Sequence, residues 1–363
     1  MRRSGIRDSG NALQLPAELW DSGFLRACRG ESVAVTPVWL MRQAGRYMPH
    51  YREIRARSSF LNLCKEPALC AEVAIHAQQY LGVDAAIVFS DILVILEALG
   101  MPLEFSAGDG PKLPRALRSL QDVDALREAQ AAVADLGYVH QAVALTVAGL
   151  PRAIPCIGFS GGPFTLASYA IEGGSSRQFA HTKAFMYGEP RAWGRLMDRL
   201  VPAIAAHLTA QIRAGASCVQ IFESWAGALT RADFTEFLAP HLRAVIAGLP
   251  SGVPVISFAS GASHLQDLIS ACGGDVLGID THGDLAATFA WRALHAPGSA
   301  LQGNLDPCLL LAPRERLLAG AAAVLAHARG QHGFIFNLGH GVLKETAPEQ
   351  ARLLVEFVHQ GKH

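Results

Sequence analysis

The sequence has little lysine, few aromatic residues and no excess of either charge. Lysine occurs only at positions 65, 112, 183, 344 and 362, so arginine supplies nearly all the cations. The 31 basic and 31 acidic residues balance to a net charge of 0. Proteins that bind nucleic acid or a membrane surface usually carry a strongly basic face. The charge balance therefore predicts neither partner, and local arginines must meet any anionic ligand.

The cysteines and apolar runs exclude further classes of protein. Seven cysteines, an odd number without tight spacing, do not form the pattern of a disulfide framework and are typical of a reduced cytoplasm. No apolar stretch follows Arg2, Arg3 and Arg7 as it would in a signal peptide, and none is long enough to span a bilayer. We expect residues 1–18 to form a mobile tail, because they show no periodicity.

Apolar runs bounded by turn residues predict eight strands, each followed by a segment of helical periodicity. Parallel strands need such crossovers, so the alternation predicts one parallel sheet. Eight repeats indicate a single (β/α)8 barrel of the TIM type over residues 19–363. An open doubly wound sheet is the alternative, but the Gly-x-Gly-x-x-Gly turn of dinucleotide-binding folds is absent. The predicted strands are 33–41, 85–89, 154–159, 218–222, 254–258, 276–279, 300–302 and 333–338.

Local signals also predict where three of the helices begin. Asp233 is an expected cap for the helix that runs to Leu249, and Asp284 for the helix through Trp291. Pro348 suits the first turn of the last helix, where the missing N–H costs nothing.

Polar residues concentrate where the predicted strands end, and in a barrel those ends meet on one face, which carries the chemistry of barrel enzymes. For Ser257, Ser260 and Asp306 we favour a simple role in ending strands and capping helices. The two arginines and Asp91 would instead face a shared pocket. The strand-end set is Arg42, Arg46, Ser90, Asp91, Ser160, Gly161, Gly162, Glu223, Ser224, Ser257, Ser260, Asp280, Asn304, Asp306, Asn337 and His340.

The most specific motif follows the first predicted strand and reads PVWLMRQAGRYMPHYRE from Pro37. It places Arg42 and Arg46 four residues apart. Two guanidinium groups at a strand end are suited to binding carboxylates through bidentate, charge-assisted hydrogen bonds.

This motif resembles the N-terminal signature of the uroporphyrinogen decarboxylase family. Further segments are similar to its later blocks in the same order: AAIVFSDILVILEALGM, GFSGGPFTLASYAIEGG, IFESWAGAL, QGNLDP and FNLGHGV. The resemblance implies a cytoplasmic homodimer of single-barrel chains without metal or organic cofactor. The implied reaction converts the four acetate side chains of uroporphyrinogen III to methyl groups, giving coproporphyrinogen III and CO2 in heme and chlorophyll biosynthesis.

Carried over position by position, the resemblance assigns substrate contacts to nine residues and makes Asp91 the central catalytic group. Arg42, Tyr169, His340 and a carboxylic acid of the substrate all remain candidates for the proton donor. Departures from the family pattern are Leu96, Thr281 and the absence of a basic residue in the turn 257–260. The substrate-binding set is Arg42, Gln43, Ala44, Gly45, Arg46, Asp91, Tyr169, Ser224 and His340.

Two other functions are consistent with such a barrel. Cobalamin-dependent methyltransferases share the decarboxylase-like fold but bind zinc through a His-x-Cys pair, and no cysteine here has a histidine two residues before it. A protein that only binds porphyrins would keep the arginines but would not need a buried Asp91.

Overall fold

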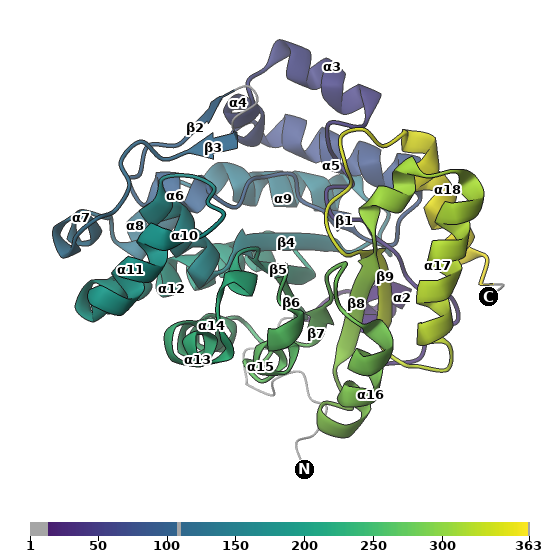
Figure 1. Cartoon of the computed structure of the whole chain (residues 1–363). Coiled ribbons are helices and arrows are strands. Elements are labelled where there is room, and N and C mark those ends of the chain that lie inside the picture. The colour runs from purple at the N-terminus through teal and green to yellow at the C-terminus, as the bar shows by residue number, and fades with distance from the viewer. Residues whose placement is uncertain (1–13, 107–109, 362–363) are drawn as a thin grey trace.

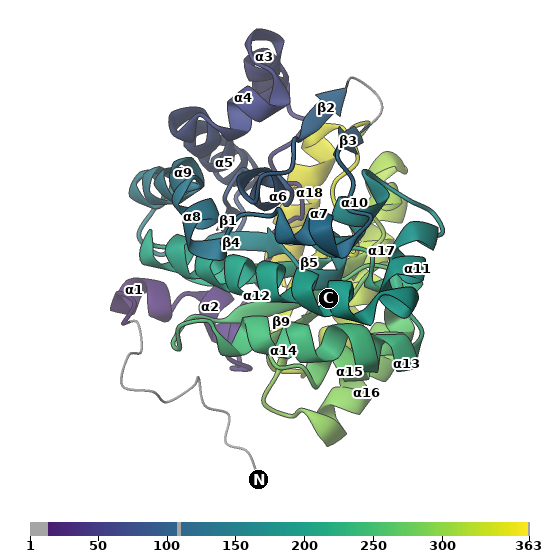
Figure 2. The same cartoon turned by 90° about the vertical axis from the view of Figure 1, so that its left-hand side faces the viewer.

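A computed structural model describes residues 14–106 and 110–361. The central element is a curled sheet of seven parallel strands, with helices on its outer side (Figures 1 and 2). Neighbouring strands follow chain order around the sheet. The strands are β1 (Ala86–Ile87), β4 (Cys156–Gly161), β5 (Cys218–Glu223), β6 (Val255–Ala259), β7 (Val276–Gly278), β8 (Ala300–Leu305) and β9 (Phe334–Leu338).

The α/β class and seven of the eight predicted strands are confirmed, but the prediction of a strand over 33–41 is wrong. That segment contributes one isolated bridge, between Val38 and Phe336 of β9. The Val38 N–H donates to the carboxylate of Asp84 (2.7 Å), and the Met41 N–H donates to the side chain of Asn337 (3.0 Å). Side chains thus replace the backbone acceptors that a regular ladder would supply, and the observed sheet has seven strands.

The segment around Val38 nevertheless lies between the two edge strands. On one side the Phe336 N–H donates to Pro37 O (2.8 Å), and on the other the Asp84 N–H donates to Val38 O (2.8 Å). A buried chain of hydrogen bonds also ties it to the sheet interior, where Trp39 Nε1 donates to Gln302 (2.8 Å) and Gln302 donates to Gln220 (3.1 Å). These contacts place the following loop at the carboxyl ends of the strands.

The longer helices cover the outer face of the sheet, and their starts follow local chemistry. Asp284 caps its helix by accepting from the Ala287 N–H (2.9 Å), and Pro348 lies in the first turn of the last helix, as predicted. These helices are α5 (Pro67–Leu81), α9 (Gly137–Gly149), α10 (Pro163–Glu172), α12 (Pro190–Arg213), α14 (Ala239–Ala247), α16 (Leu285–His295), α17 (Arg314–Ala328) and α18 (Pro348–His359). Shorter helices are α3 (Pro49–Arg57), α4 (Phe60–Cys64), α6 (Val94–Ala98), α7 (Leu120–Asp124), α8 (Ala129–Ala134), α11 (Ala180–Gly188) and α15 (Gln266–Ser270).

The predicted cap at Asp233 is wrong. The N-cap of α13 (Arg231–Asp233) is Thr230, and Asp233 is the third residue of that helix, where its side chain completes a capping box. The helical path continues through a π-helical turn, Phe234–Leu238, into α14. An aspartate in the first turn satisfies backbone donors much as an N-cap does, which explains the misplacement.

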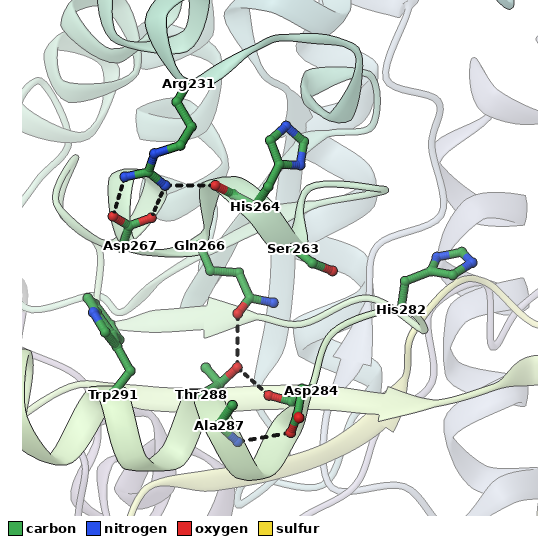
Figure 3. A pocket seen from close by; sticks show the side chains of 10 residues that line it. All are labelled: Arg231, Ser263, His264, Gln266, Asp267, His282, Asp284, Ala287, Thr288 and Trp291. Carbon is green, nitrogen blue, oxygen red and sulfur yellow. Dashed lines mark hydrogen bonds and ion pairs between the residues drawn. The ribbon is translucent and has the colours of Figure 1, made fainter.

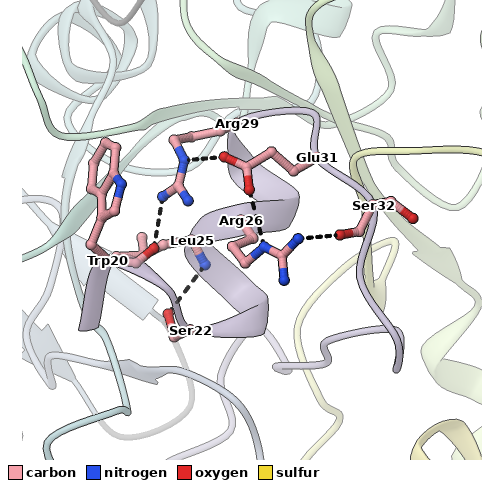
Figure 4. Close-up of polar contacts among 7 residues, drawn as sticks. All are labelled: Trp20, Ser22, Leu25, Arg26, Arg29, Glu31 and Ser32. Carbon is pink, nitrogen blue, oxygen red and sulfur yellow. Dashed lines mark hydrogen bonds and ion pairs between the residues drawn. The ribbon is translucent and has the colours of Figure 1, made fainter. Parts of the chain in front are cut away.

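A short antiparallel hairpin and two N-terminal helices complete the fold. The hairpin joins β2 (Glu104–Ser106) to β3 (Gly110–Lys112) and was not predicted. At the other end, α1 (Ala17–Trp20) and α2 (Gly23–Cys28) are held by Arg29, whose guanidinium lies 3.9 Å from the centre of the Trp20 ring and binds Glu31 (Figure 4). Of the predicted tail, residues 1–13 lie outside the described residues. Within the described ranges, no helix has both the length and the apolar character needed to cross a bilayer.

Candidate active site

The buried side chain of Gln43 anchors the loop 42–46 to the neighbouring main chain. The amide of Gln43 is fully buried, accepting from the Leu40 N–H (3.1 Å) and donating to Ala85 O (3.1 Å). The Tyr47 hydroxyl donates to Gln43 O (2.7 Å). Arg42 and Arg46, by contrast, are exposed. The side chain of Gln43 therefore holds the loop, and only its main chain could meet a ligand.

Arg42 has an unusual backbone conformation, with φ at +61°. A residue with a side chain seldom adopts the left-handed region, and such outliers cluster at functional sites. The surroundings enforce it: Met41 N–H donates to Asn337, and Val342 N–H donates to Met41 O (2.8 Å). The last strand and the loop after it thus fix the arginine from two sides.

Asp91 lies beyond the end of β1, close enough to Arg42 for the arginine charge to act on it. Its Oδ1 accepts from the Leu93 N–H (2.8 Å). The carboxylate keeps some accessible surface, yet so much protein surrounds it that burial raises the pKa of Asp91 to about 6, against the opposing effects of Leu93 and the Arg42 charge. At neutral pH it is mainly ionised and holds a proton more readily than an ordinary aspartate.

Tyr169 comes from the second half of α10 and lies near Asp91 and Arg42, whose charges act on it. Its ring is 9 % exposed and lies 5.7 Å from the Trp225 ring, centre to centre. Burial and the Asp91 charge raise the pKa of Tyr169 to about 12, so the phenol keeps its proton at neutral pH and is a hydrogen-bond donor. Ser224, which precedes Trp225 at the end of β5, is half-buried.

His340 follows β9 and lies next to Arg42. Much of its side chain is accessible, but partial burial and the Arg42 charge lower the pKa of His340, which favours the neutral imidazole. It follows a strand and caps no described helix. The structure thus brings together Arg42, Asp91, Tyr169 and His340 from four separate segments.

Glu223 is a neighbour of this cluster whose role the sequence did not reveal. It is 3 % exposed and accepts from the Phe164 N–H (3.0 Å), the Thr165 N–H (3.0 Å) and the Thr165 hydroxyl (2.8 Å). Burial raises the pKa of Glu223 to about 7 against these three donors. The carboxylate ties β5 to the first turn of α10 and so positions both Ser224 and Tyr169. The sequence signals that could have indicated this contact are the acidic residue at the end of β5 and the proline that begins α10 after β4.

Several other strand-end residues form hydrogen bonds with the backbone of the loops. Asp280 binds the Gly261 and His282 N–H groups, and the Asn304 amide donates to Asp280 O (2.9 Å). Asp306 accepts from the Cys308 N–H (2.9 Å) at the start of a helical turn, which confirms its predicted capping role.

A hollow of about 460 Å³ lies apart from the arginine loop, between the segments after β6 and β7 and helix α16 (Figure 3). Its arginine, Arg231, is already paired through both terminal nitrogens with Asp267 (2.7 Å each) and also donates to His264 O. None of the predicted site residues lines it. We therefore place the candidate site at the arginine loop rather than at this hollow.

Among residues 14–106 and 110–361, no group of three or more His, Cys, Asp or Glu side chains is arranged to hold a metal ion. All seven cysteines are free thiols, and only Cys308 is exposed.

Comparison with known proteins gives a consistent family. The sequence profile described as uroporphyrinogen decarboxylase matches residues 21–361. A uroporphyrinogen decarboxylase of Desulfotalea psychrophila is 45 % identical over 93 % of this chain and 98 % of its own. One from Roseiflexus sp. is 46 % identical over the same shares of the two chains.

Solved structures agree on the fold. A methyltransferase from Methanosarcina mazei superposes with a TM-score of 0.75 over 93 % of this chain and 98 % of its own, at 18 % identity. At that identity the likeness concerns the fold alone.

Proposed function

Since the chain belongs to the uroporphyrinogen decarboxylase family, we propose that the cluster formed by Arg42, Asp91, Tyr169 and His340 is where it decarboxylates its substrate. The chain is a carboxy-lyase that acts on uroporphyrinogen in porphyrin biosynthesis. Our proposal adds that the substrate is the III isomer, that all four acetate arms become methyl groups, and that neither metal nor organic cofactor takes part. The observation that carries it is that the exposed Arg42 lies beside a half-buried, ionisable aspartate, Asp91, at the strand ends.

The chemistry requires an electron sink for the bond that breaks. A proton added to a pyrrole ring carbon gives a cation, which accepts the electron pair of the C–CO2 bond as CO2 leaves. The exocyclic methylene that remains takes up a proton to become methyl, and loss of the ring-carbon proton restores the pyrrole. One CO2 is thus exchanged for one proton, and the substrate itself supplies the sink that other decarboxylases take from a cofactor.

Asp91 is suited to stabilise the pyrrole cation by accepting its N–H hydrogen bonds. At an effective dielectric near 20 and about 4 Å, such an ion pair is worth about 4 kcal/mol, or about a thousandfold in rate if it forms fully in the transition state. The role requires the ionised form, and at neutral pH a pKa of about 6 keeps most of the carboxylate charged.

The remaining residues bind and orient the arms. Arg42 and Arg46 would grip carboxylates, while the protonated phenol of Tyr169 and the neutral ring of His340 would donate hydrogen bonds. Ser224 and the main chain of Gln43, Ala44 and Gly45 complete the set carried over from the family.

The proposal also covers the architecture. The hydrogen bonds of the Val38 segment to both edges of the sheet support closure into a (β/α)8 barrel formed by residues 19–363, with residues 1–18 as a dispensable tail. We further propose a cytoplasmic homodimer that binds neither nucleic acid nor membranes.

A turnover assay separates this proposal from a porphyrin carrier or a methyltransferase. The purified protein is incubated anaerobically with uroporphyrinogen III, and coproporphyrinogen III and CO2 are measured. We expect four CO2 per substrate consumed. Binding of substrate without release of CO2 would overturn the proposal in favour of a carrier.

A further inference from the structure

The side chain of Arg42 lies directly across Gly341. A β-carbon placed on Gly341 would come within 2.3 Å of Cδ, 2.6 Å of Cγ and 2.9 Å of Nε of Arg42. Contacts below 3.0 Å essentially never occur for real β-carbons. The stem of the arginine therefore fills the space that any larger residue at position 341 would need.

The backbone of Gly341 does not itself require glycine. Its φ lies outside the left-handed range, so alanine could adopt the same conformation. All three close atoms belong to one flexible side chain. An added methyl group would thus displace the arginine stem rather than disrupt the main chain.

The same loop also fixes the backbone on which Arg42 is carried. Val342, the next residue, donates its N–H to Met41 O (2.8 Å), and Asn337 accepts from the Met41 N–H (3.0 Å). The segment after β9 therefore restrains both the main chain before Arg42 and the stem of its side chain.

We propose that Gly341 is a positioning residue: because it has no side chain, the stem of Arg42 can lie across it and extend toward a substrate carboxylate. A long arginine loses much rotamer freedom when it grips a ligand, and a stem already laid in place reduces that loss. The inference rests on the proposed function, in which Arg42 binds a carboxylate arm.

The first test is Gly341→Ala, with kcat, KM and thermal unfolding measured on the same preparations. Displacement of the guanidinium by about an ångström should lower kcat/KM about tenfold to a hundredfold. Most of the loss should appear in KM, because carboxylate binding is shared by ground state and transition state. The melting temperature should match or exceed that of the parent. A matched control is Gly188→Ala at the exposed end of α11, where a β-carbon meets nothing within 4 Å, and it should leave all three values unchanged.

The second test is a double-mutant cycle with Arg42→Ala, read as kcat/KM and as substrate affinity. Once the stem is gone, adding Gly341→Ala should change either value by less than about twofold. Losses that multiply, or a normal KM in Gly341→Ala alone, would overturn the inference. Should Gly341→Ala alone fail to fold, Arg42→Ala/Gly341→Ala must regain the parent's melting temperature, and failure to do so also overturns it. Normal turnover by Arg42→Ala alone would instead refute the proposed function.

Discussion

Replacing Asp91 with asparagine should change turnover and stability in opposite directions. Asparagine keeps the size of the side chain and an oxygen to accept from the Leu93 N–H, but it removes the charge. Without the ion pair to the pyrrole cation, turnover should fall by about a thousandfold. Asp91→Glu keeps the charge one methylene further out and should retain part of the activity.

The effect on stability follows from the pKa. Burial raises the pKa of Asp91 from 3.8 to about 6, which makes the ionised form cost at most about 3 kcal/mol in the folded protein. A raised folded-state pKa means that stability is complete below pH 3.8 and declines as the pH rises through about 6. Asparagine does not ionise, so its advantage over aspartate should grow across that window and then remain constant.

Coproporphyrinogen formation and urea unfolding between pH 4 and pH 8 would measure both effects on the parent and the two variants. Asp306→Asn is the matched control, because Asp306 caps a turn at another strand end and asparagine caps as well. If Asp91→Asn turned over nearly as fast as the parent, electrostatic stabilisation by Asp91 would be refuted. A stability difference that does not vary with pH would show that burial does not perturb this carboxyl.

Three further predictions concern binding, acid stability and metals. Arg42→Ala and Arg46→Ala should each lower kcat/KM with little change in the free energy of unfolding. Lysine at either position should restore activity only in part, because it cannot form the bidentate hydrogen bonds of a guanidinium. Normal kcat/KM in either alanine variant would contradict the proposed role of that arginine in binding substrate. Burial, together with the neighbouring His140 ring, lowers the pKa of His207 to about 3. As the pH falls from 7 to 5, the unfolded chain binds a proton at His207 that the folded protein does not bind, so this group should lower the free energy of unfolding by roughly 2 kcal/mol. The test is the difference in the free energy of unfolding between the parent and His207→Gln, and a difference that stays constant between pH 7 and pH 5 would argue against it. Dialysis against a strong chelator should leave activity intact, whereas a loss restored by zinc would reveal a metal enzyme.

Most of the sheet could be predicted because its signals are local. Apolar runs flanked by turn residues were sufficient for the seven observed strands, and Asp284 and Pro348 marked helix starts within a single turn. The first predicted strand failed for a non-local reason. The N–H groups of Val38 and Met41 bond to the side chains of Asp84 and Asn337, which lie 46 and 296 residues further along the chain.

Part of the candidate site could likewise be predicted from the sequence, and part depends on contacts between distant residues. The arginine motif, Asp91, Tyr169 and His340 were found by their resemblance to a family, and their charges act on one another in the structure. The part played by Glu223 could not be predicted, because its donors lie 58 and 59 residues upstream. A carboxylate that organises a helix start has no sequence pattern of its own until the fold brings the two together.

The dependence of the arginine loop on the last strand has a consequence for the order of assembly. Residues 37–47 leave the ribosome early, but several of their restraints come from Gln302, Phe336, Asn337 and Val342, far along the chain. Contacts separated by 263 and 296 residues must await the closure of a very long stretch of chain. The loop that we propose to bind substrate is therefore synthesised early, but it reaches its final conformation only after the last strand has formed. A nascent chain that still lacks β9 contains every strand before it, but it lacks Asn337 and Val342, which hold the backbone before Arg42.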